Sequence, residues 1–150
     1  MFSSTRRKRS ATRLGYGTVA TLLRGVDSPG HTILVVDDDP SIQRLVVMTF
    51  EMEGWEVVIA DDGIAGLAAA RAESPDAILL DVMMPKMDGL TVAAELKGDP
   101  ETARIPLVLL SAKAQAGDLG AGMATGADEY ITKPFDPLDL LDRVAALIAR

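Results

Sequence analysis

The chain has 150 residues, enough for one domain with a complete hydrophobic core. It contains no cysteine, which excludes disulfide bonds, thiolate metal sites and a cysteine nucleophile. The net charge of −7 is unevenly divided: residues 1–30 carry six basic and one acidic side chain, and residues 31–150 carry nine basic and 21 acidic ones. So acidic a body is not expected to bind nucleic acid directly.

The basic segment at residues 1–30 has no clear helical or strand period and ends in a Ser-Pro-Gly loop signal. We expect a disordered extension ahead of a single domain at residues 31–150. Two alternatives remain open: a start codon placed too far upstream, with initiation near Val26, or an Arg- and Ser-rich targeting segment. No apolar run approaches the roughly 20 residues that span a bilayer, so we expect no membrane contact. The absence of cysteine fits a reducing compartment, and we expect a cytoplasmic protein.

Short apolar runs alternate with helical patterns from Thr32 onward. The run TILVV at 32–36 predicts a buried strand, and a helix follows, with Asp39 as N-cap and Pro40 in its first turn. The run at 55–60 predicts a second strand before an alanine-rich helix N-capped near Asp62. The run at 76–80 predicts a third strand before a helix N-capped at Asp88.

The second half of the chain continues this alternation. Strands are predicted at 105–111 and 128–132, and the last helix begins with Asp136 as N-cap and Pro137 after it. The stretch between these strands, residues 112–127, has a helical pattern interrupted by three glycines, Gly117, Gly120 and Gly122. Each of them costs about 1 kcal/mol relative to alanine, so we expect a short or labile helix.

Five predicted strands alternating with five predicted helices indicate an α/β fold, a doubly wound five-stranded parallel sheet covered on both faces. Such sheets carry their sites at the carboxyl ends of the strands. The polar residues at these ends should therefore converge. They are Asp37, Asp38, Asp81, Ser111 and Lys133.

Three converging carboxylates repel one another unless a cation compensates them. Oxygen ligands of this kind suit Mg²⁺. With an ammonium group from Lys133 and a hydroxyl from Ser111, the set has the parts needed for phosphoryl transfer, with Asp81 as the nucleophile. Capping of a helix or turn is the structural alternative for Asp81. Capping of the first helix is the alternative for Asp37 and Asp38, but Asp39 already has that role. The single histidine, His31, precedes the first strand and is expected to have no role.

Four motifs, ILVVDDDP, LLDVMMPKMDG, LLSAKA and YITKPF, occur in this order and resemble the receiver domain of two-component response regulators, over about residues 32–150. The resemblance implies a flavodoxin-like (βα)5 fold with strand order 2-1-3-4-5. It also implies that Asp81 accepts a phosphoryl group from a phosphohistidine. Asp37 and Asp38 would form an acidic Mg²⁺ pocket with Asp81 and the backbone carbonyl of Met83. Of Asp37 and Asp38, the resemblance favours Asp38 as the residue that contacts the ion directly.

The resemblance further implies a conformational switch. Ser111 would move to bind the phosphoryl group and Tyr130 would swing inward, although a half-buried aromatic at the sheet edge is the simpler reading of Tyr130. The peptide bond between Lys133 and Pro134 would be cis. The readout face would comprise the fourth helix, the fifth strand and the fifth helix.

The function expected from this resemblance is a signalling switch and not an enzyme, with no output domain after the last helix. Its partners would be a sensor histidine kinase or histidine phosphotransfer protein and a downstream protein effector, with no direct DNA binding. A small-substrate phosphatase and a phosphorylation-independent binding module are the alternatives. The phosphatase class usually has an acid where Met83 stands. We also expect Met83, with Lys113, to limit the access of water to the site, and Met84 to fill the core.

Overall fold

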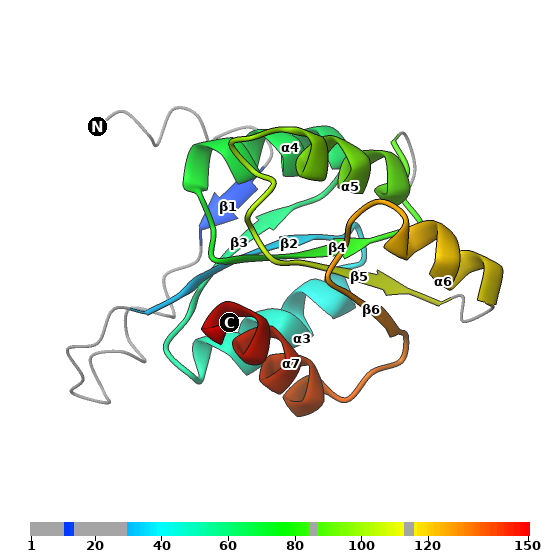
Figure 1. Ribbon diagram of the computed structural model, residues 1–150. Coiled ribbons are helices and arrows are strands. Elements are labelled where there is room, and N and C mark those ends of the chain that lie inside the picture. The colour runs from blue at the N-terminus through cyan, green and yellow to red at the C-terminus, as the bar shows by residue number, and fades with distance from the viewer. Residues whose placement is uncertain (1–10, 14–29, 85–86, 113–115) are drawn as a thin grey trace.

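The computed structural model describes residues 11–13, 30–84, 87–112 and 116–150 (Figure 1). They form a six-stranded sheet of order β1-β3-β2-β4-β5-β6. The strands are β1 (Ala11–Arg13), β2 (Thr32–Val36), β3 (Glu56–Ala60), β4 (Ala77–Asp81), β5 (Leu107–Ser111) and β6 (Glu129–Thr132). The five strands β2 to β6 pair in parallel, so the predicted doubly wound sheet and its 2-1-3-4-5 order are confirmed.

Helices cover both faces of this sheet (Figure 1). One face carries α3 (Pro40–Glu51) and α7 (Pro137–Ala149), and the other carries α4 (Gly63–Glu73) and α5 (Gly89–Gly98). The short helix α6 (Ala116–Met123) lies beside β6. Its length of eight residues agrees with the short helix that the three glycines predict.

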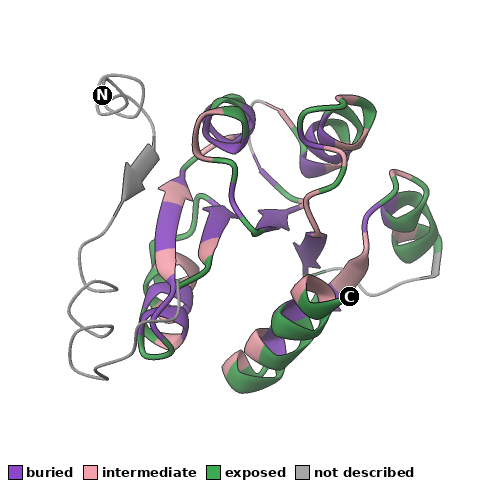
Figure 2. Ribbon diagram, turned by 60° about the vertical axis from the view of Figure 1, so that its left-hand side comes forward, coloured by how far each residue is buried: buried purple, intermediate pink, exposed green. Residues whose placement is uncertain are grey.

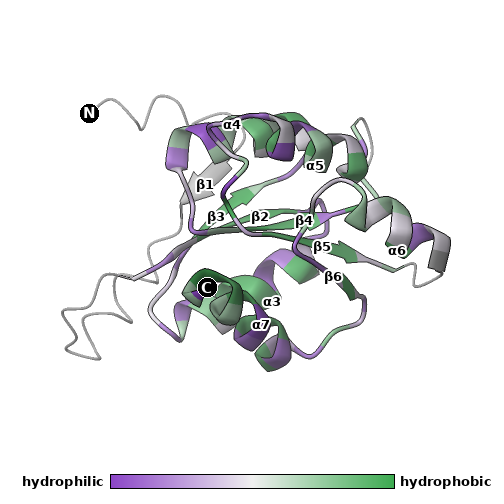
Figure 3. Ribbon diagram, viewed as in Figure 1, coloured by the Kyte–Doolittle hydropathy of each residue, from purple (hydrophilic) through white to green (hydrophobic). Residues whose placement is uncertain are grey.

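The central strands are apolar between their ends because both of their faces are covered, and Asp81 and Ser111 are polar residues at the ends of β4 and β5. Alternate residues of β2 point to opposite sides, with Leu34 in the core under α4 and α5 and Val35 in the core under α3 and α7. Every residue of β4 is buried, and so is every residue of β5. Figure 2 shows the buried strands between helices that are exposed on their outer sides, and Figure 3 shows the matching concentration of hydrophobic residues in the sheet.

Aspartates begin four of the five helices of the described chain, as the sequence predicts. Each side chain accepts a hydrogen bond from a backbone N–H in the first turn of its helix, which stabilises a helix by about 1 kcal/mol. These N-caps are Asp39, Asp62, Asp88 and Asp136.

The strand β1 was not predicted. It runs antiparallel to β3, with Ala11 opposite Ala60 and Arg13 opposite Val58, and so extends the sheet at its β3 edge. This strand lies within residues 1–30, where a disordered extension is expected, and residues 1–10 and 14–29 of that segment lie outside the described residues. Among the helices of the described ranges, none is both long and apolar enough to cross a membrane.

Candidate functional site

Three carboxylates meet where β2 and β4 end. Asp37 follows β2, Asp81 is the last residue of β4, and these two strands are neighbours in the sheet. Asp37, Asp38 and Asp81 each offer a carboxylate oxygen, and these atoms lie within 4.8 Å of one another. Asp37 and Asp81 are buried and Asp38 is exposed. The strand-end argument therefore locates the acidic cluster correctly.

Lys133 supplies the positive charge that the cluster needs. Its Nζ atom lies 3.0 Å from Oδ2 of Asp37 and 3.4 Å from Oδ1 of Asp81. The backbone N–H of Lys133 donates to the carbonyl of Ser111 at 2.7 Å, which ties the residue after β6 to the end of β5. The Lys133–Pro134 peptide bond is cis, as the resemblance implies.

One ammonium group does not fully compensate two buried carboxylates. Burial, and then the charge of Asp37, raise the pKa of Asp81, against the opposing effects of Lys133 and of the Met83 N–H that donates to its Oδ1 at 3.3 Å. Burial would lower the pKa of Lys133, but the hydrogen bond and charge of Asp37, together with Asp81, raise it. The site therefore favours additional positive charge.

A divalent cation fits this donor set. The oxygens of Asp37, Asp38 and Asp81 are hard ligands, they are close enough to share one ion, and their negative charge is under-compensated. Mg²⁺ is bound in proteins by one or two carboxylates together with waters and phosphate oxygens. The acidic pocket is consistent with a magnesium site on these grounds.

Gln43 holds the acidic loops in place, and the sequence interpretation missed it. Its Nε2 atom donates to the carbonyl of Asp37 at 2.7 Å and to Oδ1 of Asp61 at 2.8 Å, so it joins the loops after β2 and β3. Gln43 stands one helical turn after the N-cap Asp39. A long polar side chain at that position was the available signal.

The start of α5 lies directly against the end of β4. The N–H of Gly89 donates to the carbonyl of Val82 at 2.9 Å. A Cβ atom on Gly89 would collide with the carbonyl oxygen of Asp81 and lie 2.6 Å from Cα of Val82. Only glycine fits at position 89 without moving the backbone that carries Asp81.

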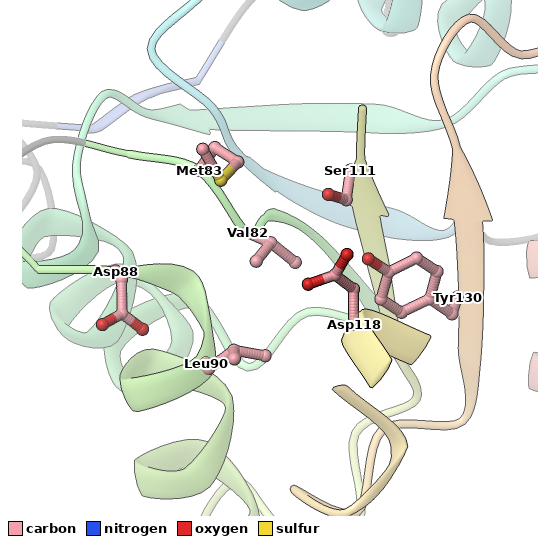
Figure 4. Close-up of a pocket in the computed structure, with 7 residues that line it drawn as sticks. All are labelled: Val82, Met83, Asp88, Leu90, Ser111, Asp118 and Tyr130. Atoms are coloured by element: carbon pink, nitrogen blue, oxygen red, sulfur yellow. The ribbon is translucent and has the colours of Figure 1, made fainter. Parts of the chain in front are cut away.

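A pocket of about 200 Å³ opens beside the acidic cluster (Figure 4). Ser111, at the end of β5, is fully buried, and Tyr130, in β6, is half-buried. Met83 is 53% exposed at the rim, whereas Met84 is 9% exposed and packs in the core, as predicted. The lining residues are Val82, Met83, Asp88, Leu90, Ser111, Asp118 and Tyr130. Asp118 of α6 was not predicted, and Lys113 lies outside the described residues.

The single histidine lies at the opposite end of β2 from the acidic cluster. His31 is exposed, and its ring lies 4.8 Å from that of Trp55, centroid to centroid. It also lies 3.8 Å from Oδ2 of Asp76. These contacts leave the site without a histidine, as the sequence predicts.

Comparison with known proteins identifies the family. Residues 33–145 match the model of the response regulator receiver domain. The chemotaxis protein CheY4 of Vibrio cholerae superimposes with a TM-score of 0.75 at 31% identity, covering 79% of this chain and 99% of that one. The receiver domain of a sensor histidine kinase from Pseudomonas aeruginosa, solved with magnesium in its active-site cleft, gives a TM-score of 0.75 at 30% identity, covering 81% and 100%.

Curated relatives are longer than this chain. It is 49% identical over 118 residues to the DNA-binding dual master transcriptional regulator RpaA of Synechocystis. The matched region covers 79% of this chain and 49% of that protein. It is 39% identical over 125 residues to the DNA-binding response regulator MtrA of Mycolicibacterium smegmatis, covering 83% and 54%. The chain thus spans about half the length of these relatives.

Proposed function

The chain belongs to the response regulator receiver domain family of two-component systems, and from this premise we propose that Asp81 is the residue whose phosphorylation operates the switch. The observation that carries the proposal is the contact of one ammonium group with two buried carboxylates, Lys133 with Asp37 and Asp81, beside the exposed carboxylate of Asp38. A capping aspartate at the end of β4 would need neither the lysine nor the other two acids.

The proposed step is transfer from a phosphohistidine of a sensor kinase or histidine phosphotransfer protein. A carboxylate oxygen of Asp81 forms a bond to phosphorus as the P–N bond breaks, and the imidazole nitrogen keeps the electron pair and takes up a proton. Lys133 holds a phosphoryl oxygen through a charge-assisted hydrogen bond. Mg²⁺, when bound by Asp37, Asp38, Asp81 and the carbonyl of Met83, supplies positive charge to the phosphoryl oxygens.

The proposed response runs through Ser111 and Tyr130, which line one pocket with Met83. Ser111 donates to the new phosphoryl group, and Tyr130 moves towards the space that Ser111 leaves. The equilibrium between the two conformations shifts by as much as the interaction free energy of the phosphoryl group differs between them. A downstream protein effector binds the face formed by α6, β6 and α7. The hydrophobic side chains of Leu119, Met123 and Leu138 are exposed on these helices.

We propose that this segment does not itself bind DNA, because residues 31–150 carry nine basic and 21 acidic side chains. RpaA and MtrA are named as DNA-binding regulators, but each of these proteins is about twice as long as the region that matches this chain. The domain acts as a switch in phosphotransfer and not as an enzyme that turns over an external substrate.

Incubation with Mg²⁺ and acetyl phosphate, followed by intact-mass spectrometry, tests the proposal. We expect an adduct of about +80 Da that is absent in Asp81→Asn. Asp76→Asn, in the loop before β4, is the control and should retain it. A wild-type chain without the adduct would favour a phosphorylation-independent binding module. Catalytic release of phosphate without accumulation of the adduct would favour a phosphatase.

A further inference from the structure

We propose that Gly122 is a positioning residue for the switch, because it forms the surface of α6 against which the Tyr130 ring rests. The inference deepens the proposed function, since it concerns how the observed conformation is held. Gly122 is one of three glycines in α6, and from the sequence all three are expected only to weaken the helix. The structure separates Gly122 from the other two.

The ring of Tyr130 occupies the place where a side chain at position 122 would stand. A Cβ atom built on Gly122 would lie 2.8 Å from both Cδ2 and Cε2 of Tyr130 and 3.0 Å from Cδ1 of Leu109. A Cβ atom on Gly120 or on Gly117 would have no neighbour within 4 Å. The contact with the aromatic ring is therefore specific to position 122.

Local hydrogen bonds close the end of the helix at Gly122 and hold the shape of this turn around an added methyl group. The carbonyl of Gly122 accepts a hydrogen bond from the hydroxyl of Thr125 at 2.6 Å and from its N–H at 3.2 Å. Leu109 is fully buried in the core and pairs with Tyr130 in the sheet. Tyr130 is half-buried, so its ring is the part that would move.

The pocket lined by Ser111 and Tyr130 provides the space for this movement. Figure 4 shows the ring beside α6, with its hydroxyl directed from β6 towards the pocket. A methyl group at position 122 removes the observed resting place and favours a ring position nearer Ser111. Gly122 thus stabilises the conformation described here, and filling its place shifts the population towards the phosphorylated conformation.

The position of the ring can be measured without phosphorylation. The chain has two tyrosines, so 3-fluorotyrosine in a Tyr16→Phe background gives one ¹⁹F resonance, from position 130. We expect Gly122→Ala to shift this resonance and to reduce its broadening by a soluble gadolinium chelate, as the ring leaves solvent. Gly120→Ala is the matched control, because it adds the same methyl group to the same helix in open space.

A spectrum of Gly122→Ala that superimposes on that of Gly120→Ala would overturn the proposal. A ring that becomes more accessible to the chelate would overturn it as well. Thermal unfolding gives a second test: Gly122→Ala should unfold below Gly120→Ala, and this difference should become smaller in a Tyr130→Ala background, because the two closest clashes are with the Tyr130 ring and only the contact with Leu109 remains. An undiminished difference in that background would assign the effect to something other than Tyr130.

Phosphorylation by acetyl phosphate connects the device to function. We expect the initial rate of adduct formation in Gly122→Ala to rise about tenfold, and in Gly120→Ala to change by less than about twofold. A wild-type chain that forms no adduct would contradict the proposed function, but the ¹⁹F comparison would still decide the role of Gly122. A shifted ring with an unchanged phosphorylation rate would overturn the coupling to the switch.

Discussion

The Nζ atom of Lys133 lies 3.0 Å from Oδ2 of Asp37, although the two residues are 96 positions apart in the chain. Asp37 is fully buried, and this contact supplies a positive charge to its carboxylate. We expect Lys133→Met to lower the free energy of unfolding by about 3 kcal/mol at neutral pH, because it leaves buried carboxylates without their cation. Urea unfolding measures the change. A loss below about 0.5 kcal/mol would mean that the pair contributes no more than an exposed one.

Asp81→Asn should have the opposite effect when no metal is present. Burial and the charge of Asp37 disfavour the ionised Asp81 carboxylate in the folded protein, so a neutral amide removes an unfavourable charge. We expect a higher midpoint of urea unfolding in the presence of EDTA. Asp99→Asn is a control of opposite sign, since the Glu101 N–H and Arg71 lower the pKa of Asp99 and favour its charge. A lower midpoint for Asp81→Asn would show that its charge is well compensated.

Mg²⁺ should stabilise the folded protein through the exposed Asp38. A ligand that binds only the folded state at ten times its Kd raises the free energy of unfolding by about 1.4 kcal/mol. We expect Asp38→Asn to lose most of this increase. The neighbouring Asp39→Asn should keep it, because Asp39 accepts from Ser41 as the N-cap of α3 and asparagine is an equally good cap. If both variants lost the Mg²⁺-dependent increase equally, the effect would come from the overall negative charge of the loop and not from Asp38.

The side chain of Met83 should set the lifetime of the phosphorylated form. It is 53% exposed at the rim of the pocket that Ser111 lines, so it can limit the approach of water. We expect Met83→Asn to accelerate dephosphorylation about threefold to tenfold, roughly 0.7 to 1.4 kcal/mol in the barrier. Met48→Asn on α3 replaces a similarly exposed methionine and should have no effect. An unchanged rate in Met83→Asn would exclude the shielding role.

Lys97 should be far more important for stability than Arg71, although both are basic residues in the last turn of a helix. Its Nζ atom donates to the carbonyls of Ala103 and Ile105 at 3.0 and 2.9 Å and pairs with Asp128 at 3.2 Å. We expect Lys97→Met to cost about 2 to 3 kcal/mol, because these acceptors are partly buried. Arg71→Met should cost less than about 1 kcal/mol, since its pair with Asp99 is exposed. Similar losses would contradict this ranking.

Most of the fold follows from local patterns that the sequence carries plainly. Apolar runs predict the five parallel strands, and the aspartates Asp39, Asp62, Asp88 and Asp136 begin their helices as expected. The acidic cluster and Lys133 could be predicted because parallel strands bring their carboxyl ends to one edge. The order of the strands came from the resemblance, because apolar runs alone do not say which strands are neighbours.

The features that the sequence did not predict depend on contacts between distant segments. The strand β1 has three residues and no alternation of its own, and only its pairing with β3 defines it. Lys97 reads as a surface lysine on an amphipathic helix, but the loop before β5 folds back over it. Gly122 reads as a helix-weakening residue until the ring of Tyr130 is found against it.

The contact between Gly89 and the end of β4 separates the position of Asp81 from the chemistry of the side chain at position 83. The two ends of the loop are joined by the hydrogen bond from Gly89 to Val82, and the absence of a side chain at position 89 lets them touch. Because this hydrogen bond and the close approach of Gly89 hold residues 82 and 89 together, a change of the exposed side chain at position 83 need not alter the distance between Asp81 and α5. A designer could therefore vary the side chain at position 83 on one unchanged scaffold and obtain switches whose phosphorylated forms have different lifetimes.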